Sequence, residues 1–235
     1  MIRSVLCGIA VVGVAMPSMA MLGRSGSPAP AVLAPQPEVG LELATSSGEE
    51  VAIFSGGCFW GVQAVFQHMK GVTSAVSGYT GGSLRNPSYE QVSTGSTGHA
   101  ESVRVTFDPS QVSYANLLRA FFAVATDPTE LNYQGPDHGT QYRSVLWYTS
   151  DAQKTTAKAY IEQLTKAKTY PNQIVTEVKP AQAFYNAAGC HQDYETLHPD
   201  QPYIAINDAP KVANLKRLFP ELYREQPVLV GSTQP

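Results

Sequence analysis

The apolar positions along the chain predict an alternation of strands and helices. Residues 51–54 form a short apolar run typical of a buried strand, and residues 101–107 alternate between polar and apolar side chains, as a half-buried strand does. Further strands are expected at 72–79, 141–148 and 174–178, and apolar residues spaced three and four apart predict helices at 62–69, 114–121, 157–164 and 212–219. This order favours the α+β class, with a compact single domain, a small mixed sheet flanked by helices, and irregular C-terminal segments.

The first twenty residues have the pattern of a secretory signal peptide. Arg3 precedes an apolar run over residues 5–16, and Ser18-Met19-Ala20 fits a small-residue cleavage site. The run is too short to span a bilayer comfortably, so an uncleaved membrane anchor is the less favoured alternative. We therefore expect cleavage after Ala20 and an exported, periplasmic protein.

The rest of the chain divides into three parts. Residues 21–48 are rich in Pro, Ala, Ser and Gly and lack periodicity, which predicts a disordered tether. The folded domain is expected over residues 49–222. Residues 223–235 are expected to form a frayed tail.

Charge argues against a nucleic-acid partner, because the 235-residue chain has a formal net charge of −3 and no basic run stands out. The five histidines show no ligand spacing with the cysteines. We therefore expect no metal site and no bound cofactor, and we expect a monomer.

Cys58 is the leading candidate for chemistry. It lies between the expected strand at 51–54 and the expected helix that follows, in a turn that begins with Gly56-Gly57. The start of a helix favours an anion, so a thiol there ionises more easily than a free one. A buried, inert cysteine is the alternative, but Phe59 and Trp60 directly after it favour a site open to a ligand. We interpret Cys58 as a nucleophile.

Two acidic residues are further candidates. The alternation at 101–107 places Glu101 on the apolar face, where burial would raise its pKa; because it lies at the strand end, it could instead reach solvent. Asp137 lies in the long irregular segment 126–140, and segments of this length are usually functional or disordered. Its alternative role is turn formation after Gly135-Pro136.

The cysteine count leaves a second question. Cys7 lies in the signal peptide and would leave with it, so the mature chain would keep Cys58 and Cys190. In an oxidising compartment these two could form one structural disulfide or a transient, catalytic one.

Several sequence blocks resemble those of the A-type peptide methionine sulfoxide reductases. The resemblance covers roughly residues 49–222. Its blocks occur in the family's order, and they are Gly57-Cys58-Phe59-Trp60-Gly61, Gly78-Tyr79-Thr80-Gly81-Gly82, Asn86-Pro87-Ser88-Tyr89-Glu90, Thr97-Gly98-His99-Ala100-Glu101, Gln134-Gly135-Pro136-Asp137 and Gly139-Thr140-Gln141-Tyr142-Arg143-Ser144. The resemblance implies an enzyme that reduces the S epimer of methionine sulfoxide, free or in oxidised proteins.

The resemblance also implies roles for individual residues. Cys58 would attack the sulfoxide sulfur and become a sulfenic acid, while Phe59 and Trp60 would hold the methyl group of the substrate. The other implied catalytic residues are Glu101, which would protonate the sulfoxide oxygen, Tyr89 and Tyr142, which would donate hydrogen bonds to it, and Asp137, which would help to organise the site.

The chain departs from the family pattern where the sulfenic acid must be reduced. Many members carry a resolving cysteine after a C-terminal tyrosine, but here Ile204 follows Tyr203. Cys190, in place of a usual tyrosine, could be a relocated resolving cysteine whose disulfide with Cys58 is reopened by a thioredoxin-like reductant. Alternatively, Cys58 works alone and meets an external thiol directly.

Two other classes remain as alternatives from the residues alone. A cysteine hydrolase could use Cys58 with His99 or His191 as a base. A secreted, disulfide-stapled binding domain is the non-enzymatic alternative.

Overall fold

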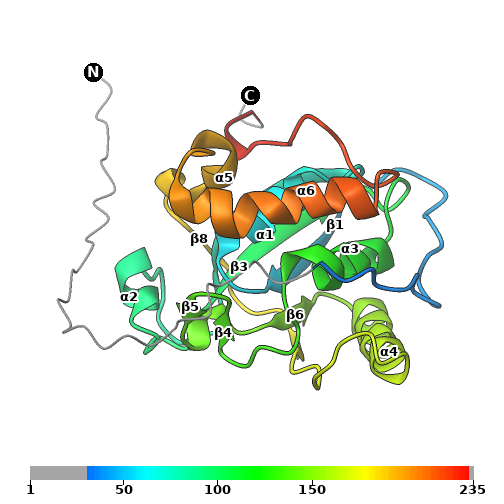
Figure 1. Cartoon of the computed structure of the whole chain (residues 1–235), viewed down its shortest axis with the longest axis horizontal. Helices are drawn as coiled ribbons and strands as arrows, with labels where there is room; N and C mark the ends of the chain where they lie inside the picture. Colours follow the sequence, from blue (N-terminus) through cyan, green and yellow to red (C-terminus); the bar gives the residue numbers. More distant parts are fainter. Residues whose placement is uncertain (1–30, 233–235) are drawn as a thin grey trace, which may run out of the picture.

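The computed structural model describes residues 31–232 of the chain, and its centre is a six-stranded sheet of order β7-β6-β1-β3-β2-β8 (Figure 1). The strands β6 and β7 pair in parallel and the other neighbours pair antiparallel, which confirms the predicted mixed sheet. The strands are β1 Glu50–Ser55, β2 Val72–Thr80, β3 Ala100–Phe107, β6 Val145–Tyr148, β7 Glu177–Pro180 and β8 Tyr185–Asn186, with a separate hairpin of β4 Tyr133–Gln134 and β5 Asp137–His138.

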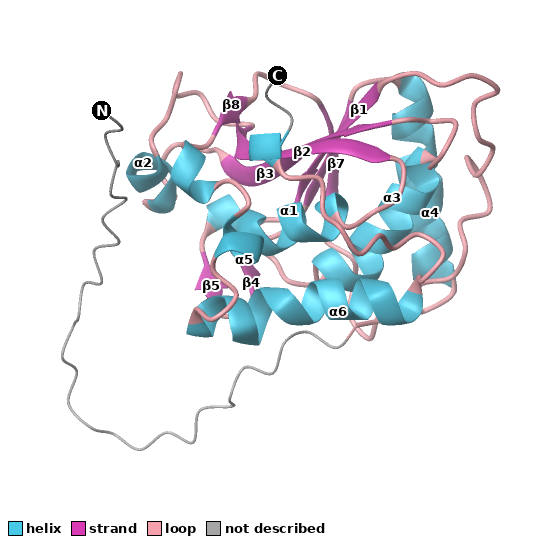
Figure 2. Ribbon diagram, turned by 90° about the horizontal axis from the view of Figure 1, so that it is seen from above, coloured by secondary structure: helices cyan, strands magenta, loops and turns pink. Residues whose placement is uncertain are grey.

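Helices α1, α5 and α6 gather on one side of this sheet (Figure 2). The helices are α1 Phe59–Gln67, α2 Tyr89–Ser93, α3 Tyr114–Ala120, α4 Asp151–Lys166, α5 Tyr194–Leu197 and α6 Ala209–Leu218. Short helical turns complete the described part of the chain; they are the π-helical η1 Phe121–Ala125 and η4 Ile204–Asp208 and the 3-10 segments η2 Thr140–Tyr142, η3 Gly189–His191 and η5 Val230–Ser232.

Strand β1 shows how the sheet separates two apolar layers. Successive side chains of a strand point to opposite faces. Accordingly, Ala52 and Phe54 belong to the large core under the helices, whereas Ile53 packs with Trp147 in a smaller cluster on the opposite face. The apolar run predicted from the sequence is therefore buried on both faces.

All nine residues of α1 are buried, including its polar side chains. This is more than the one apolar stripe that the sequence predicts, because α1 lies between the sheet and the C-terminal helices α5 and α6. Its polar residues are hydrogen-bonded rather than exposed: Gln63 Nε2 donates to Ala75 O at 2.9 Å, and Gln67 Nε2 donates to Asp193 Oδ1 at 2.6 Å. The middle and the end of α1 are therefore held firmly in the core.

Two predicted strands differ from the observed ones. The strand expected at 141–148 begins only at Val145, because Thr140–Tyr142 forms a 3-10 turn after Gly139. The strand expected at 174–178 is β7, which begins at Glu177. The first difference matters for function, because it places Tyr142 on a turn.

Residues 31–48, which composition assigns to a disordered tether, instead lie along the domain. Ala34 is fully buried, and Tyr160 Oη donates to Pro35 O at 2.8 Å. Ser47 Oγ donates to Asp108 Oδ2, also at 2.8 Å. The low periodicity of this segment reflects extended chain bonded to neighbouring helices and loops.

The C-terminal segment also differs from the expected frayed tail. Arg224 N donates to His68 O at 2.8 Å, and Val228 N donates to Gln67 O at 3.1 Å. Val230 N then donates to Asp193 Oδ1 at 3.0 Å. Residues 224–230 thus run back over the end of α1.

The predicted signal peptide, residues 1–20, lies outside the described residues, as does Cys7. Within residues 31–232, none of the helices combines the length and apolar character needed to cross a bilayer.

Candidate active site

Cys58 lies at the N-cap of α1, directly after β1 and a tight turn. Gly57 has a φ of +98°, a conformation that strongly favours glycine, and a β-carbon there would lie 2.7 Å from the side chain of Gln134. The Cys58 side chain is only 8% exposed, and it forms no disulfide. The sequence prediction of a cysteine at a strand-to-helix turn is therefore confirmed.

The electrostatic environment of Cys58 differs from the expectation of an easily ionised thiol. Burial raises the pKa of Cys58 well above its usual value, and the charges of Asp208, Glu101 and Asp137 raise it further. A hydrogen bond from the Trp60 backbone lowers the pKa of Cys58, but by less than burial and the three charges raise it. The cost of burying a charged thiolate outweighs the stabilisation that a helix N-terminus offers it, so the resting enzyme keeps Cys58 as a thiol.

Glu101 lies beside Cys58 on the buried face of β3. Its side chain is 2% exposed, which excludes the alternative that it reaches solvent. Phe59 N, in the first turn of α1, donates to Glu101 Oε2 at 3.0 Å. Burial raises the pKa of Glu101 to about 8, and this hydrogen bond only partly opposes the shift. Glu101 therefore holds a proton at neutral pH.

Phe59 and Trp60 belong to an aromatic cluster behind Cys58. The Trp60 ring stacks on Tyr194 with centroids 3.9 Å apart, and the edge of Tyr203 lies 5.9 Å away. The Phe59 ring lies 5.7 Å from both Tyr79 and His191. Four aromatic partners from separate parts of the chain thus surround the pair.

Tyr89 reaches this cluster from α2, which begins with a capping box formed by Ser88 and Gln91. Its ring stacks on His191 with centroids 4.3 Å apart. Burial, and then the charges of Glu101 and Cys58, raise the pKa of Tyr89 to about 12. Tyr89 is therefore a protonated hydrogen-bond donor near both residues.

Tyr142 reaches the site from the 3-10 turn η2. Burial raises its pKa, and the charges of Glu101 and Asp137 add to this shift. Arg143 fixes the turn, because its guanidinium donates to Thr140 O at 2.8 Å and to Gly98 O at 2.9 Å. The same two bonds tie the turn of Tyr142 to the loop that leads into Glu101.

Asp137 lies on β5 and accepts a short hydrogen bond from Tyr203 Oη. Burial raises the pKa of Asp137, although this bond and the charge of Lys211 lower it. The sequence analysis assigns no role to Tyr203; the two residues are 66 positions apart, so no local pattern could pair them. The turn-forming alternative for Asp137 does not account for this contact.

Asp208 is a second residue that the sequence analysis missed. It is fully buried at the start of α6, and Lys211 Nζ lies 3.2 Å from its Oδ1. The carboxylate packs directly against Gly61 of α1, which leaves no room for a β-carbon there. Position 61 therefore couples the cysteine-bearing helix to a buried ion pair.

Gly61→Ala should destabilise the protein by about 1–3 kcal/mol, because the added methyl group would overlap the Asp208 carboxylate and lie 3.0 Å from Lys211 Nζ. Urea unfolding followed by circular dichroism measures the effect. Gly189→Ala is the matched control, since a β-carbon at Gly189 meets nothing within 4 Å. Equal stability of the two variants would contradict the tight contact at Gly61.

Cys190 lies in η3, immediately before His191. The following residue, Gln192, holds this segment in place, because its side-chain amide bonds to Ser77 N, Ser77 O and Ala187 O at 2.9–3.1 Å. Cys190 is thus one residue away from a ring that packs on Phe59.

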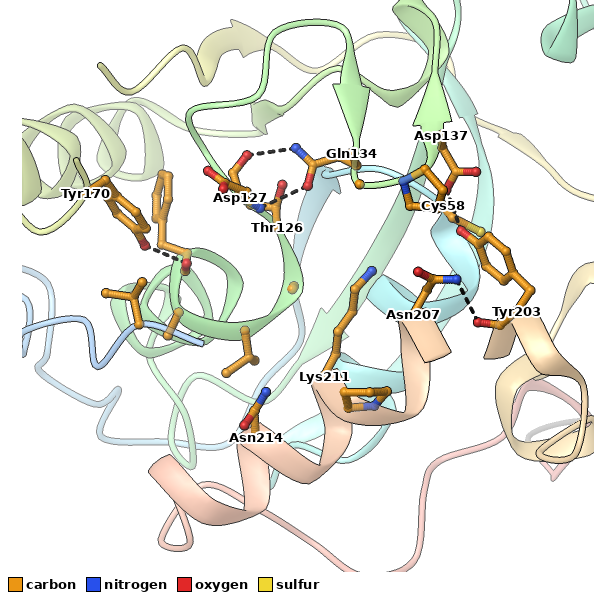
Figure 3. Close-up of a pocket in the computed structure, with 18 of the residues that line it drawn as sticks. Cys58, Thr126, Asp127, Gln134, Asp137, Tyr170, Tyr203, Asn207, Lys211 and Asn214 are labelled. Atoms are coloured by element: carbon orange, nitrogen blue, oxygen red, sulfur yellow. Dashed lines mark hydrogen bonds between the residues drawn. The ribbon is translucent and has the colours of Figure 1, made fainter. Parts of the chain in front are cut away.

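A cavity of about 150 Å³ opens beside Cys58 (Figure 3). Asp137 and Tyr203 line it near the cysteine, and Asn207 of η4 and Lys211 of α6 line it beyond them. The other predicted site residues do not line this cavity; Phe59, Trp60 and Glu101 are packed behind Cys58. Among residues 31–232, no cluster of three or more His, Cys, Asp and Glu side chains could hold a metal ion.

The histidines are poorly placed for hydrolase chemistry. Both ring nitrogens of His99 are bonded to backbone groups, Nδ1 to Gly82 N at 3.2 Å and Nε2 to Leu84 O at 2.7 Å. His191 is stacked between aromatic rings, and burial lowers its pKa. A sulfur nucleophile facing a protonated acid instead defines a thiol-dependent oxidoreductase.

Comparison with known proteins identifies the family within this class of oxidoreductases. Residues 50–222 match the family model described as peptide methionine sulfoxide reductase. The chain is 61% identical over 185 residues to peptide methionine sulfoxide reductase MsrA 2 of Mesorhizobium japonicum, covering 79% of this chain and 95% of the relative. It is 48% identical over 177 residues to peptide methionine sulfoxide reductase MsrA of Polynucleobacter asymbioticus, and the match covers 75% of this chain and 93% of that relative.

Two solved structures are similar as well. Methionine sulfoxide reductase A of Corynebacterium diphtheriae has a TM-score of 0.55 at 32% identity and covers 78% of this chain and 92% of its own. Mxr1 of Saccharomyces cerevisiae in its reduced form has a TM-score of 0.60 at 29% identity, and the match covers 68% of this chain and 91% of the Mxr1 chain. The chain belongs to the peptide methionine sulfoxide reductase family, A type. It is a peptide-methionine (S)-S-oxide reductase, which repairs oxidative damage with thiol chemistry.

Proposed function

We propose that Cys58 and Glu101 carry out the reduction of methionine S-sulfoxide, free or in oxidised proteins. The observation that carries this assignment is the hydrogen bond of Phe59 N to Glu101, which holds a buried, protonated acid beside the residue that follows Cys58. A sulfoxide oxygen leaves poorly until it is protonated, so the nucleophile needs a proton donor beside it.

The proposed step transfers one oxygen atom. Cys58 Sγ attacks the sulfoxide sulfur and forms an S–S bond to it while Glu101 gives its proton to the oxygen, and the proton of the Cys58 thiol restores the acid. The S–S bond and the S–O bond of the substrate then break as the hydroxyl group moves to Cys58 and forms an S–O bond there, so the reduced thioether leaves. The substrate sulfur gains two electrons, and Cys58 loses two to become a sulfenic acid.

The surrounding residues would place the substrate. Tyr89 and Tyr142, whose raised pKa values keep them protonated, would donate hydrogen bonds to the sulfoxide oxygen. Phe59 and Trp60 would hold the methyl group, and this requires the aromatic cluster to open toward the cavity. Asp137, fixed by Tyr203, would position the wall of the site nearest Cys58.

A single turnover tests the assignment. Reduced enzyme is mixed with one equivalent of each separated epimer of N-acetyl-methionine sulfoxide, and the peptide that contains Cys58 is examined by mass spectrometry after sulfenic-acid trapping. The S epimer should yield one equivalent of N-acetyl-methionine and a trapped oxidation at Cys58. Formation of N-acetyl-methionine without oxidation of Cys58 would exclude Cys58 as the nucleophile.

The sulfenic acid must then be reduced by two further electrons, which we propose come from a thioredoxin-like dithiol. The second thiol in our proposal is Cys190, because it adjoins His191, whose ring packs on Phe59 and Trp60. In the fully reduced enzyme the Cys190 thiol would attack the sulfenic acid of Cys58, form a disulfide with it and release water, and the dithiol would then reopen that disulfide. Direct attack on Cys58 by the external thiol is the competing route.

Cys190→Ser separates these routes. If Cys190 resolves, the variant should still complete one turnover but should lose most of its steady-state rate with a thioredoxin-like donor. Non-reducing mass spectrometry of the unmodified enzyme after one turnover should then reveal a peptide pair joined through Cys58 and Cys190. Full steady-state activity of Cys190→Ser would support the direct route.

We also propose that the enzyme is exported to the periplasm as a monomer. Residues 1–20 support the first part through Arg3, the apolar run that follows it, and the small-residue site ending at Ala20. N-terminal sequencing of enzyme from a periplasmic extract tests the cleavage after Ala20, and light scattering tests the monomer. An uncleaved N-terminus in the membrane fraction would favour the anchor.

A further inference from the structure

The cavity beside Cys58 continues away from the reaction centre as a trough. One wall is the end of η1 and the loop after it, and the opposite wall is formed by Asn207 of η4 and by Lys211 and Asn214 of α6 (Figure 3). The trough reaches Tyr170 and Val32 at its far end. It therefore joins the reactive cysteine to a region outside the proposed catalytic machinery.

The trough is longer than a single side chain. Its enclosed part, about 150 Å³, is comparable to an engineered cavity that holds a benzene molecule, and so suits a single side chain. The lining residues Asn207, Lys211 and Asn214 follow one another over roughly 10 Å of helix at about 1.5 Å per residue, so the trough continues along this wall. An occupant of the whole trough must extend beyond the oxidised residue.

The trough offers polar groups to such an occupant. Thr126 is 8% exposed, and its Oγ1 is buried without a hydrogen-bond partner. A buried hydroxyl in this state costs free energy unless a ligand supplies the missing bond. On the facing wall, Asn214 uses its Oδ1 to accept a bond from Arg217, which leaves its amide N–H groups as donors.

The far end is apolar and firmly held. Val32 N donates to Ala123 O at 3.1 Å, and Tyr170 Oη donates to Phe122 O at 2.6 Å. With their polar groups engaged, the Val32 side chain and the Tyr170 ring present apolar surface. One apolar side chain would fit against them.

Charge along the trough disfavours an acidic occupant. Asp127 and Asp137 both line it, and Lys211, the one cation among the described residues that line it, is paired with the buried Asp208. The occupant of the trough should therefore be a neutral chain with hydrogen-bonding groups in its backbone. Polypeptide in an extended conformation has this chemistry.

We propose that the trough binds an extended segment of the oxidised polypeptide next to its methionine sulfoxide. Backbone groups of the segment bond to the Thr126 hydroxyl and the Asn214 amide, and an apolar side chain of the segment contacts Val32 and Tyr170. The trough is a specificity-determining subsite of the same reaction. It makes a sulfoxide inside a peptide a better substrate than the isolated amino acid.

Steady-state kinetics with one short substrate and a series of longer ones tests this proposal. The short substrate is N-acetyl-methionine S-sulfoxide N-methylamide, which lacks the flanking residues that would fill the trough. The longer ones are peptides with blocked ends and neutral residues that extend the sulfoxide by one to five residues on either side, and their outermost residue is either Leu or Asp. For extension on one side, kcat/KM should rise with length and should be higher for Leu than for Asp. A flat length series on both sides would overturn the proposal.

Two variants locate the effect. Thr126→Val and Asn214→Ala should each lower kcat/KM for the best peptide about three- to tenfold, the range expected for one neutral hydrogen bond, and should leave the short substrate unchanged. Thr155→Val on the exposed face of α4 is the matched control. Equal losses for both substrates, or no loss for either, would refute the subsite, and turnover of the short substrate reports separately on the proposed catalytic residues.

Discussion

Cys58→Ser should abolish the reduction of methionine S-sulfoxide, because a serine hydroxyl cannot accept the sulfoxide oxygen, whereas the Cys58 thiol accepts it and becomes a sulfenic acid. The substitution should leave the fold intact, since serine is slightly smaller and is among the preferred residues at a helix N-cap, the position that Cys58 occupies. The measurement is methionine formation from the pure S epimer, with thermal unfolding run in parallel. Activity should fall below detection while the unfolding temperature changes little.

Cys190→Ser is the control for Cys58→Ser, because it removes the other thiol expected in the mature chain. It should still form one equivalent of methionine in a single turnover. If Cys58→Ser retained a first turnover, the oxygen would have to be accepted elsewhere and the proposed chemistry would be wrong.

Glu101→Gln should lower kcat/KM by about 10²- to 10⁴-fold, the usual contribution of a general acid. The amide can still accept the bond from Phe59 N, so the site should keep its shape. It carries no acidic proton to give to the sulfoxide oxygen. Rates with the S epimer measured from pH 6 to 10 check both the magnitude and the pH dependence.

The pH profile gives the sharper result. With a pKa of about 8, Glu101 is protonated below pH 8 and loses its proton above it, so the activity of the unmodified enzyme should fall as the pH rises through about 8. In Glu101→Gln this decline should be absent. Glu90→Gln, on the neighbouring helix α2, is the control and should keep the decline. A decline that persists in Glu101→Gln would assign it to another group.

The parts of the site that depend on local pattern could be predicted from the sequence. The apolar run before Cys58 and the helical spacing after it placed the thiol at a strand-to-helix turn. The alternation along β3 placed Glu101 in the core with a raised pKa. Both inferences use periods of two or 3.6 residues, which the backbone imposes on any strand or helix.

The remaining parts depend on contacts between distant segments. Tyr203 meets Asp137, and Asp208 meets Gly61, only because the C-terminal helices fold back onto α1. The raised pKa of Cys58 follows from this burial, so a helix-terminus argument alone gave the wrong direction. Extended segments such as residues 31–48 show no periodic spacing of apolar residues, and composition alone could not distinguish them from disordered segments.

The positions of the two tryptophans supply an internal optical reporter. Trp147 is fully buried on the opposite face of the sheet, and its indole N–H donates to Ser55 Oγ at 2.8 Å. Trp60 instead stacks on Tyr194 two residues after Cys58. The first lies in the smaller apolar cluster on the face of the sheet away from α1, whereas the second adjoins the sulfur that is oxidised and reduced. The time course of native fluorescence should therefore follow each half of the catalytic cycle without any label.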